Sequence, residues 1–156
     1  MKSIFSVLLV FVCFLSPLFS VAQDCPNLER QQLKKMLTDM GYEVKDLDKT
    51  DGKEKYEVDL TVQGLNIPVA YEISPSKNYI WLTIFLGNSF EDTSARNIAL
   101  LRQNAKIQPC QFYITESGKL MLGLALENRC MTPALLRKAT DMISGKVPDT
   151  QSAWGR

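Results

Sequence analysis

The sequence predicts an α+β domain with the element order α-β-β-β-α-β-β-α, in which helices pack on a five-stranded antiparallel sheet. Three observations lead to this prediction. Apolar residues recur at helical spacing in three stretches, they alternate at strand spacing in five others, and turn residues separate the stretches. With 156 residues, 46% of them hydrophobic and 22% charged, the chain has the size and composition of one globular domain.

The first helix is expected at residues 28–40, because four apolar residues there fall on one helical face. These residues are Leu33, Met36, Leu37 and Met40. Gly41 follows and suits the end of a helix. Residues 45–55 are highly charged and lack the ligand spacing of a calcium-binding loop, so they are interpreted as a solvated connector.

The first two strands are expected at residues 56–62 and 67–73, where apolar and polar residues alternate. The third strand, residues 79–86, is apolar on both faces and therefore belongs in the middle of the sheet. One of its faces is aromatic and carries Tyr79, Trp81 and Phe85.

A second helix is expected from Asp92–Ser94 through about Ala105. A hairpin follows, with strands at residues 111–115 and 120–126 joined by a Ser117-Gly118 turn. Its second strand is again apolar on both faces. Placing the two-sided strands in the middle predicts the sheet order 1-2-3-5-4.

The last helix begins with Thr132 as the N-cap and Pro133 in the first helical position, and it is expected to end at Gly145. Residues 148–156 are interpreted as a polar C-terminal tail from which Trp154 docks back onto the domain. The single folded domain is thus predicted to span residues 23–147.

Residues 1–22 have the pattern of a secretory signal peptide: a basic start, an apolar core over residues 4–15, and small residues before Gln23. An uncleaved membrane anchor is the alternative, but polar residues and Pro17 interrupt the apolar run before it reaches the length of a membrane span. The protein is therefore expected to be exported, to the periplasm or outside the cell, without a membrane association after cleavage.

Three cysteines remain after cleavage, and an odd number in an oxidising compartment suggests one disulfide with a spare thiol, or an intermolecular bond. We predict a Cys110–Cys130 disulfide, because the two ends of the hairpin lie at the same end of the sheet. Pairing Glu116 with Lys119 would place Cys110 opposite Ala125, so Cys130 would have to return through a short loop. If Cys25 lies at that same end of the sheet, it replaces Cys110 or Cys130 in the disulfide. Three buried free cysteines are the remaining alternative.

The composition also excludes several chemistries. There is no histidine, which removes serine–histidine and cysteine–histidine catalysis and imidazole metal ligation. A formal charge of +1 gives no electrostatic reason to expect nucleic acid as a partner. The paired carboxylates Glu57 and Asp59 fit the solvent side of a strand better than acid–base catalysis. We therefore expect no enzyme activity, no catalytic residue, no cofactor and no metal.

The chain resembles YbjN-like domains in four features. These are the element order, the GYEV segment at Gly41–Val44, the hairpin sequence FYITESGKLMLGLAL and the Thr132-Pro133 helix start. This bacterial family is often labelled as sensory-transduction regulators, and its fold is similar to that of type III secretion chaperones. The resemblance covers about residues 28–145. It implies an α+β sandwich used for protein–protein contacts, commonly as a dimer among the chaperones. This chain differs from these relatives in its export signal and its three remaining cysteines. No functional residue is carried over from the family.

The function that follows is an exported, non-enzymatic protein-binding module of regulatory or chaperone-like role, with a protein partner or a second copy as the ligand. If helices cover one face of the sheet, the opposite face is left as a partner or dimer interface. The residues expected there are Tyr79, Trp81, Phe85 and Met121. In the alternative, helices cover these residues as ordinary core. The second candidate function is small-molecule or lipid binding in a cavity lined by Trp81, Phe85, Met121 and Tyr71.

Overall fold

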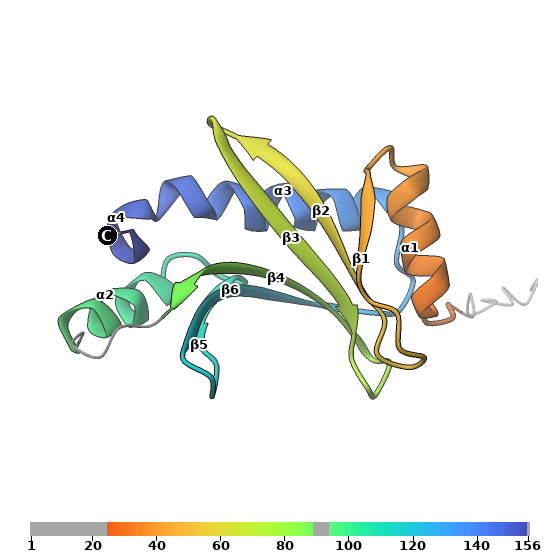
Figure 1. Ribbon diagram of the computed structural model, residues 1–156, viewed down its shortest axis with the longest axis horizontal. Helices are drawn as coiled ribbons and strands as arrows, with labels where there is room; N and C mark the ends of the chain where they lie inside the picture. Colours follow the sequence, from red (N-terminus) through yellow and green to blue (C-terminus); the bar gives the residue numbers. More distant parts are fainter. Residues whose placement is uncertain (1–24, 89–93, 156) are drawn as a thin grey trace, which may run out of the picture.

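The computed structural model describes residues 25–88 and 94–155, and the centre of this part of the chain is a six-stranded antiparallel sheet (Figure 1). The strands are β1 (Val44–Asp48), β2 (Lys55–Val62), β3 (Leu65–Ile73), β4 (Tyr79–Asn88), β5 (Gln111–Ile114) and β6 (Lys119–Glu127). Their order in space is β1-β2-β3-β4-β6-β5. The helices are α1 (Arg30–Asp39), α2 (Ser94–Asn104), α3 (Pro133–Asp149) and α4 (Gln151–Trp154).

The α+β class is confirmed, and the five predicted strands lie in the predicted order. The predicted number of strands was wrong, because β1 overlaps residues 45–55, which the sequence analysis interpreted as a solvated connector. In β1 the segment Val44–Asp48 pairs with β2 at the edge of the sheet, with Val44 opposite Val58. Lys34 of α1 binds the Asp46 carboxylate, with Nζ 2.6 Å from Oδ1, which ties the strand to the helix.

One face of the sheet is buried under α1 and α3 (Figure 1). The alternation of β2, β3, β4 and β6 sends one set of apolar side chains to this face. The two helices pack on these side chains with fully buried residues of their own. They are Leu33 and Leu37 of α1 and Leu136 and Ile143 of α3. Tyr71 of β3 also points into it, and its hydroxyl lies 2.8 Å from that of Thr140.

The helix α3 begins as predicted, because the Thr132 hydroxyl accepts a hydrogen bond from the Leu135 N–H at 3.2 Å. Its predicted end at Gly145 was wrong: the helix continues to Asp149. Val147 is buried beyond the glycine, so packing against the sheet offsets the low helix propensity of Gly145.

The predicted polar tail is also structured over its described part. Residues 151–154 form α4, and the Trp154 indole N–H donates to the Val147 carbonyl at 2.8 Å. The Arg96 guanidinium of α2 donates to the carbonyl of Trp154. Trp154 thus docks back as expected, and α2 and α4 pack together at one end of the sheet.

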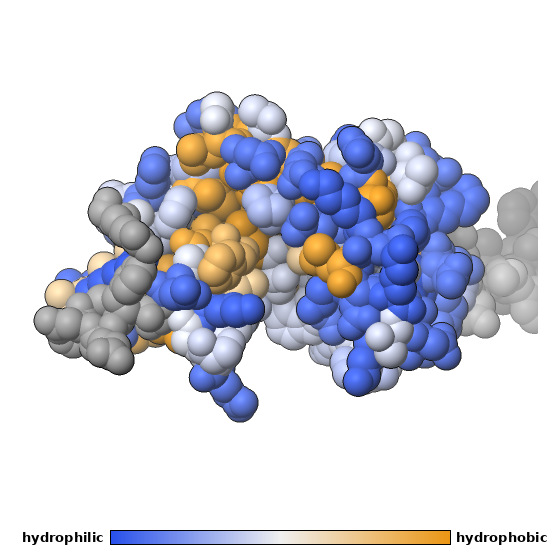
Figure 2. Space-filling view, viewed as in Figure 1, coloured by the Kyte–Doolittle hydropathy of each residue, from blue (hydrophilic) through white to orange (hydrophobic). Residues whose placement is uncertain are grey.

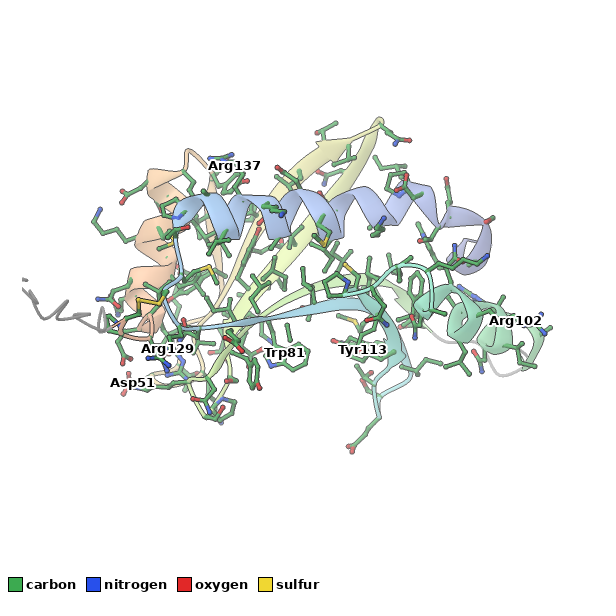
Figure 3. The ribbon with its side chains drawn as sticks, turned by 180° about the vertical axis from the view of Figure 1, so that it is seen from behind. Asp51, Trp81, Arg102, Tyr113, Arg129 and Arg137 are labelled. Carbon is green, nitrogen blue, oxygen red and sulfur yellow. A yellow bond between two sulfur atoms is a disulfide. The ribbon has the colours of Figure 1, made fainter. Side chains whose placement is uncertain are left out.

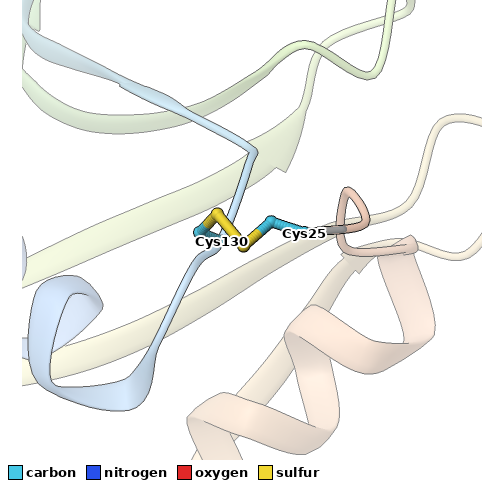
Figure 4. Close-up of a disulfide and its surroundings, with 2 residues drawn as sticks. All are labelled: Cys25 and Cys130. Atoms are coloured by element: carbon cyan, nitrogen blue, oxygen red, sulfur yellow. A yellow bond between two sulfur atoms is a disulfide. The ribbon is translucent and has the colours of Figure 1, made fainter. Parts of the chain in front are cut away.

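The disulfide joins Cys25 to Cys130, with their Cα atoms 4.8 Å apart, while Cys110 is a buried free thiol (Figure 4). The predicted Cys110–Cys130 bond is therefore wrong. The strands pair one residue away from the predicted register, since Gln111 lies opposite Gly123. This shift turns Cys110 from the outer face toward the core. Cys25 reaches Cys130 because Asn27 pairs with Arg129 just past the end of β6.

The predicted signal peptide at residues 1–22 lies outside the described residues, as does the predicted start of the second helix at Asp92-Thr93. Within the part of the chain that the structure describes, none of the helices is both long enough and apolar enough to cross a bilayer.

Candidate partner-binding surface

The second face of the sheet, opposite α1 and α3, is covered by none of the helices in the described residues, and we call it the open face. Figure 3 shows Trp81 and Tyr113 projecting from the sheet on the side away from α3. Strands β4 and β6 and the edge strand β5 contribute most of the apolar residues of this face. They are Tyr79, Trp81 and Phe85 of β4, Met121, Gly123 and Ala125 of β6, and Tyr113 of β5.

The strand register explains why these residues share one face. Residues directly opposite each other in neighbouring strands point to the same side of a sheet. Trp81 pairs with Ala125, and Phe85 pairs with Met121. Met121 pairs in turn with Tyr113 of the edge strand. The result is a continuous apolar strip across three strands.

Two of the aromatic side chains on this strip are largely open to solvent. Phe85 is 50% exposed and Tyr79 is 46% exposed, whereas Trp81 and Met121 are half-buried. The ammonium group of Lys119 lies 6.0 Å from the centre of the Phe85 ring. Exposed large aromatic side chains of this kind are enriched where proteins contact one another.

A groove of about 620 Å³ runs across the open face beside these residues. Trp81, Met121 and Tyr113 form its apolar part, and Thr83 and Gln111 add hydrogen-bonding groups. Lys55 and Glu72 close one end with an ion pair in which Nζ and Oε2 are 2.6 Å apart. The groove is thus mostly apolar, with a charged end whose two charges compensate each other.

The position of Tyr113 depends on a glycine. A Cβ atom on Gly123 would lie 2.8 Å from Cε1 of the Tyr113 ring, so the ring rests directly on the Gly123 backbone. Burial raises the pKa of the Tyr113 hydroxyl, and the nearby Glu72 carboxylate adds to the increase. Tyr113 therefore stays neutral near pH 7 and offers a phenol for hydrogen bonding beside Glu72.

The part of this face formed by β1, β2 and β3 is mostly charged, although Pro68 and Ala70 of β3 also lie on it. Lys45 of β1 forms an ion pair with Asp59 of β2, and Lys55 of β2 forms one with Glu72 of β3. Glu57 lies between them on the same face. Glu57 and Asp59 are thus on the outer side of the strand, as the alternation predicted. The charged part borders the apolar strip on one side.

The four residues predicted for an interface, Tyr79, Trp81, Phe85 and Met121, all lie on this face. Sequence reasoning did not select Tyr113. Alternation in β5 separates Tyr113 from the buried Phe112, but only the register with β6 places Tyr113 opposite Met121. Of the four residues predicted to line a small-molecule cavity, Trp81 and Met121 line the groove and Phe85 lines a separate depression. Tyr71 is fully buried on the helix-covered face. Tyr71 and Trp81 therefore line no common cavity.

Apolar side chains also reach the surface near α2. Figure 2 shows them between the β2–β3 hairpin and α2, whereas the surface over α1 and β1 is mostly hydrophilic. Leu65, Leu86 and Trp154 line a small depression there. It lies beside the end of β4 that carries Phe85, so the apolar character of the surface continues beyond the open face.

Reactive chemistry is sparse in the described part of the chain. Within residues 25–88 and 94–155 the structure brings together no three acidic or cysteine side chains that could hold a metal ion. Burial raises the pKa of the Cys110 thiol, so this thiol stays protonated and is a poor nucleophile. The open face can therefore offer stacking, apolar contact and hydrogen bonds.

No family model matches this chain, and no curated protein matches it. Its fold is similar to that of a chain in the solved heterodimeric complex ExoU–SpcU from the type III secretion system of Pseudomonas aeruginosa. The TM-score is 0.55 and the identity is 13%, over 78% of this chain and 96% of that chain. At this identity the similarity shows a shared fold, that of a component of a type III secretion complex, and nothing about shared residues.

Proposed function

We propose that this protein is an exported, non-enzymatic binding module that holds a partner protein against the open face of its sheet. One observation carries the proposal: an apolar strip with the exposed rings of Tyr79 and Phe85 runs along a sheet face that the described helices leave uncovered. Burying such a strip removes apolar surface from water, which is the main favourable term in protein association.

Two further findings support the proposal. A solved structure with a similar fold is a heterodimeric complex, so this architecture is used where two proteins assemble. The Cys25–Cys130 disulfide supports export, because such bonds persist in oxidising compartments and are rare in the cytosol. A regulatory or chaperone-like role fits a module that binds another chain without modifying it.

Site-specific photocrosslinking in the native host tests this function. A photoreactive phenylalanine analogue is placed at Phe85 on the open face, and the control places it at Lys35 on the exposed side of α1. We expect a defined crosslinked species from position 85 that position 35 does not give. The partner identified in that species is then purified, and Phe85→Ser should weaken its binding to this protein at least tenfold.

Other outcomes would contradict the proposal. Crosslinks that are equal at both positions, or absent from both, would exclude a partner on the open face. Native mass spectrometry of the purified protein separates the remaining possibilities. A retained small molecule that is lost on Trp81→Ala would favour ligand binding in the groove. A dimer that Phe85→Ser dissociates would identify the partner as a second copy.

A further inference from the structure

A second feature of the sheet lies away from the open face, at the end of β6. Strand β6 has nine residues, but β5 pairs only with the segment Leu120–Gly123. Beyond the last pair, Gln111 and Gly123, the segment Leu124–Glu127 has β4 on one side and no strand on the other within residues 25–88 and 94–155. This four-residue segment of a central strand is thus an unpaired sheet edge, although the Leu124 side chain itself is buried.

Two hydrogen bonds establish which backbone groups point out of this edge. The Thr115 N–H donates to the Lys119 carbonyl at 2.9 Å, and the Asn128 N–H donates to the Asn78 carbonyl at 2.8 Å. Because bonding direction alternates along a strand, odd-numbered residues of β6 bond toward β5 and even-numbered residues bond toward β4. The N–H and C=O groups of Ala125 and Glu127 therefore point outward from the edge.

An apolar groove of about 310 Å³ lies beside this edge, between β6 and α3. Leu124 and Leu126 form its strand side, and Leu135 and Met142 form its helix side. Leu135 is 52% exposed although it is a large apolar residue. The groove is on the helix-covered side of the sheet, where every second side chain of an added strand would point.

The rim of the groove is charged. It carries Arg129 and Lys138 against one acidic residue, Glu127. Among the ion pairs of the described residues, none involves these three side chains. The excess of positive charge favours a segment that carries carboxylates. The rim of a second copy carries the same net positive charge, so a segment with several carboxylates complements this edge better.

We propose that the Leu124–Glu127 edge and its groove bind an extended, acidic-flanked segment of another polypeptide, which adds to the sheet as a strand beside β6. Backbone hydrogen bonds to Ala125 and Glu127 hold the segment, and alternate apolar side chains enter the groove. Four edge residues provide room for a core of about four to six residues. The Ala125 side chain points to the open face, but the groove lies on the helix-covered side and includes neither Trp81 nor Phe85. The proposal therefore does not depend on the function proposed for the open face.

Synthetic peptides test the proposal directly. The probe is an eight-residue peptide that alternates valine and threonine, with aspartate at both ends and blocked termini. Two further peptides carry N-methyl groups on alternate amides, one on the valines and one on the threonines. Binding is measured by fluorescence polarisation and by NMR chemical-shift mapping. We expect binding in the micromolar range, with shifts in Leu124–Arg129 and in α3.

The two methylated peptides should differ, because only one set of amides faces the β6 edge. One peptide should lose binding at least tenfold, and the other should keep it. Ala125→Pro removes the outward N–H and should also cost at least tenfold, whereas Ala125→Thr keeps the N–H and should bind as before. Leu135→Asp introduces a charge into the groove from an exposed position of α3 and should abolish binding without unfolding the domain.

Several results would overturn the proposal. These are the absence of binding at millimolar peptide, equal binding of both methylated peptides, or binding that Leu135→Asp leaves unchanged. A dimer in the absence of peptide that Leu135→Asp dissociates would show that a second copy occupies the edge. Phe85→Ser should leave peptide binding intact, so failure of this site is distinguishable from failure of the function proposed for the open face.

Discussion

Trp81 and Leu82 are neighbours in β4, yet they face opposite sides of the sheet. Leu82 is fully buried under the helices, whereas Trp81 is half-buried on the open face. Removing a buried leucine side chain costs about 2–5 kcal/mol, because both transfer energy and packing are lost. We expect Leu82→Ala to fall in this range and Trp81→Ala to cost only about 1–2 kcal/mol, since its ring is already partly hydrated.

Urea unfolding followed by circular dichroism measures both changes in the free energy of unfolding. Because every variant keeps one of the two side chains, each serves as the other's control. If Trp81→Ala proves as destabilising as Leu82→Ala and the association state is unchanged, Trp81 belongs to the core. That result would remove it from the proposed binding surface.

Tyr71 provides a test at alkaline pH. Burial raises its pKa well above the usual value of 10.0, and its hydrogen bond with Thr140 only partly counteracts the shift. Below about pH 10 the hydroxyl is protonated in both the folded and the unfolded chain. Above that pH only the unfolded chain releases the proton, so the free energy of unfolding should fall as the pH rises.

The expected contribution of Tyr71 to this slope is about 1.4 kcal/mol per pH unit. Tyr71→Phe should lower stability at pH 7, where it loses the bond to Thr140, but its stability should fall less steeply between pH 10 and 11. Urea unfolding at several pH values measures the two slopes. Identical slopes for the two proteins would show that Tyr71 ionises equally well in the folded state.

The helix α3 depends at its start on one hydroxyl. The Thr132 side chain accepts from the Leu135 N–H, one of the backbone groups that the first turn of a helix leaves without a partner. Thr132→Ala should destabilise the domain by about 1 kcal/mol, and Thr132→Ser should cost much less because serine keeps the acceptor. Thermal unfolding compares them. Equal losses for both would indicate that the methyl group, and not the cap, matters.

The elements differ in how far local sequence specifies them. Strand β2 alternates apolar and polar residues over its length, so its position and buried face could be predicted. Strand β1 could not, because only Val44 and Leu47 are apolar among its five residues. It is an edge strand held by β2 and by the contact between Lys34 and Asp46. Tertiary contacts, and not an amphipathic pattern, stabilise it.

The disulfide links the start of the described chain to the end of β6. Its two cysteines are 105 residues apart, so it restricts the unfolded chain strongly. We expect Cys25→Ser to lower the free energy of unfolding by about 2–5 kcal/mol. Position 25 is the better choice for this variant, because Cys130 has a φ of +54°, which few side chains adopt without strain.

Dithiothreitol should lower the free energy of unfolding of the native protein by a similar amount and should not change that of Cys25→Ser. Chemical unfolding with and without the reductant measures both effects. Peptide mapping under non-reducing conditions should find Cys25 linked to Cys130 and Cys110 as a free thiol. A peptide containing Cys110 in a disulfide would contradict this pairing. It would also contradict the register between β5 and β6.

The amino-acid pattern was sufficient for the class of the fold, the order of five strands, the cap of α3 and the common face of Tyr79, Trp81, Phe85 and Met121. The strands and their two faces follow from the two-residue period of an extended chain, and the cap of α3 follows from the Thr132 hydroxyl before Pro133. Contacts between distant segments settled the pairing of Cys130 and the position of Cys110. A shift of one residue between β5 and β6 reverses the face of a side chain, and nothing local sets that register. The same is true of the open face: alternation separates the two faces of the sheet, but only the packing of α1 and α3 determines which one they cover.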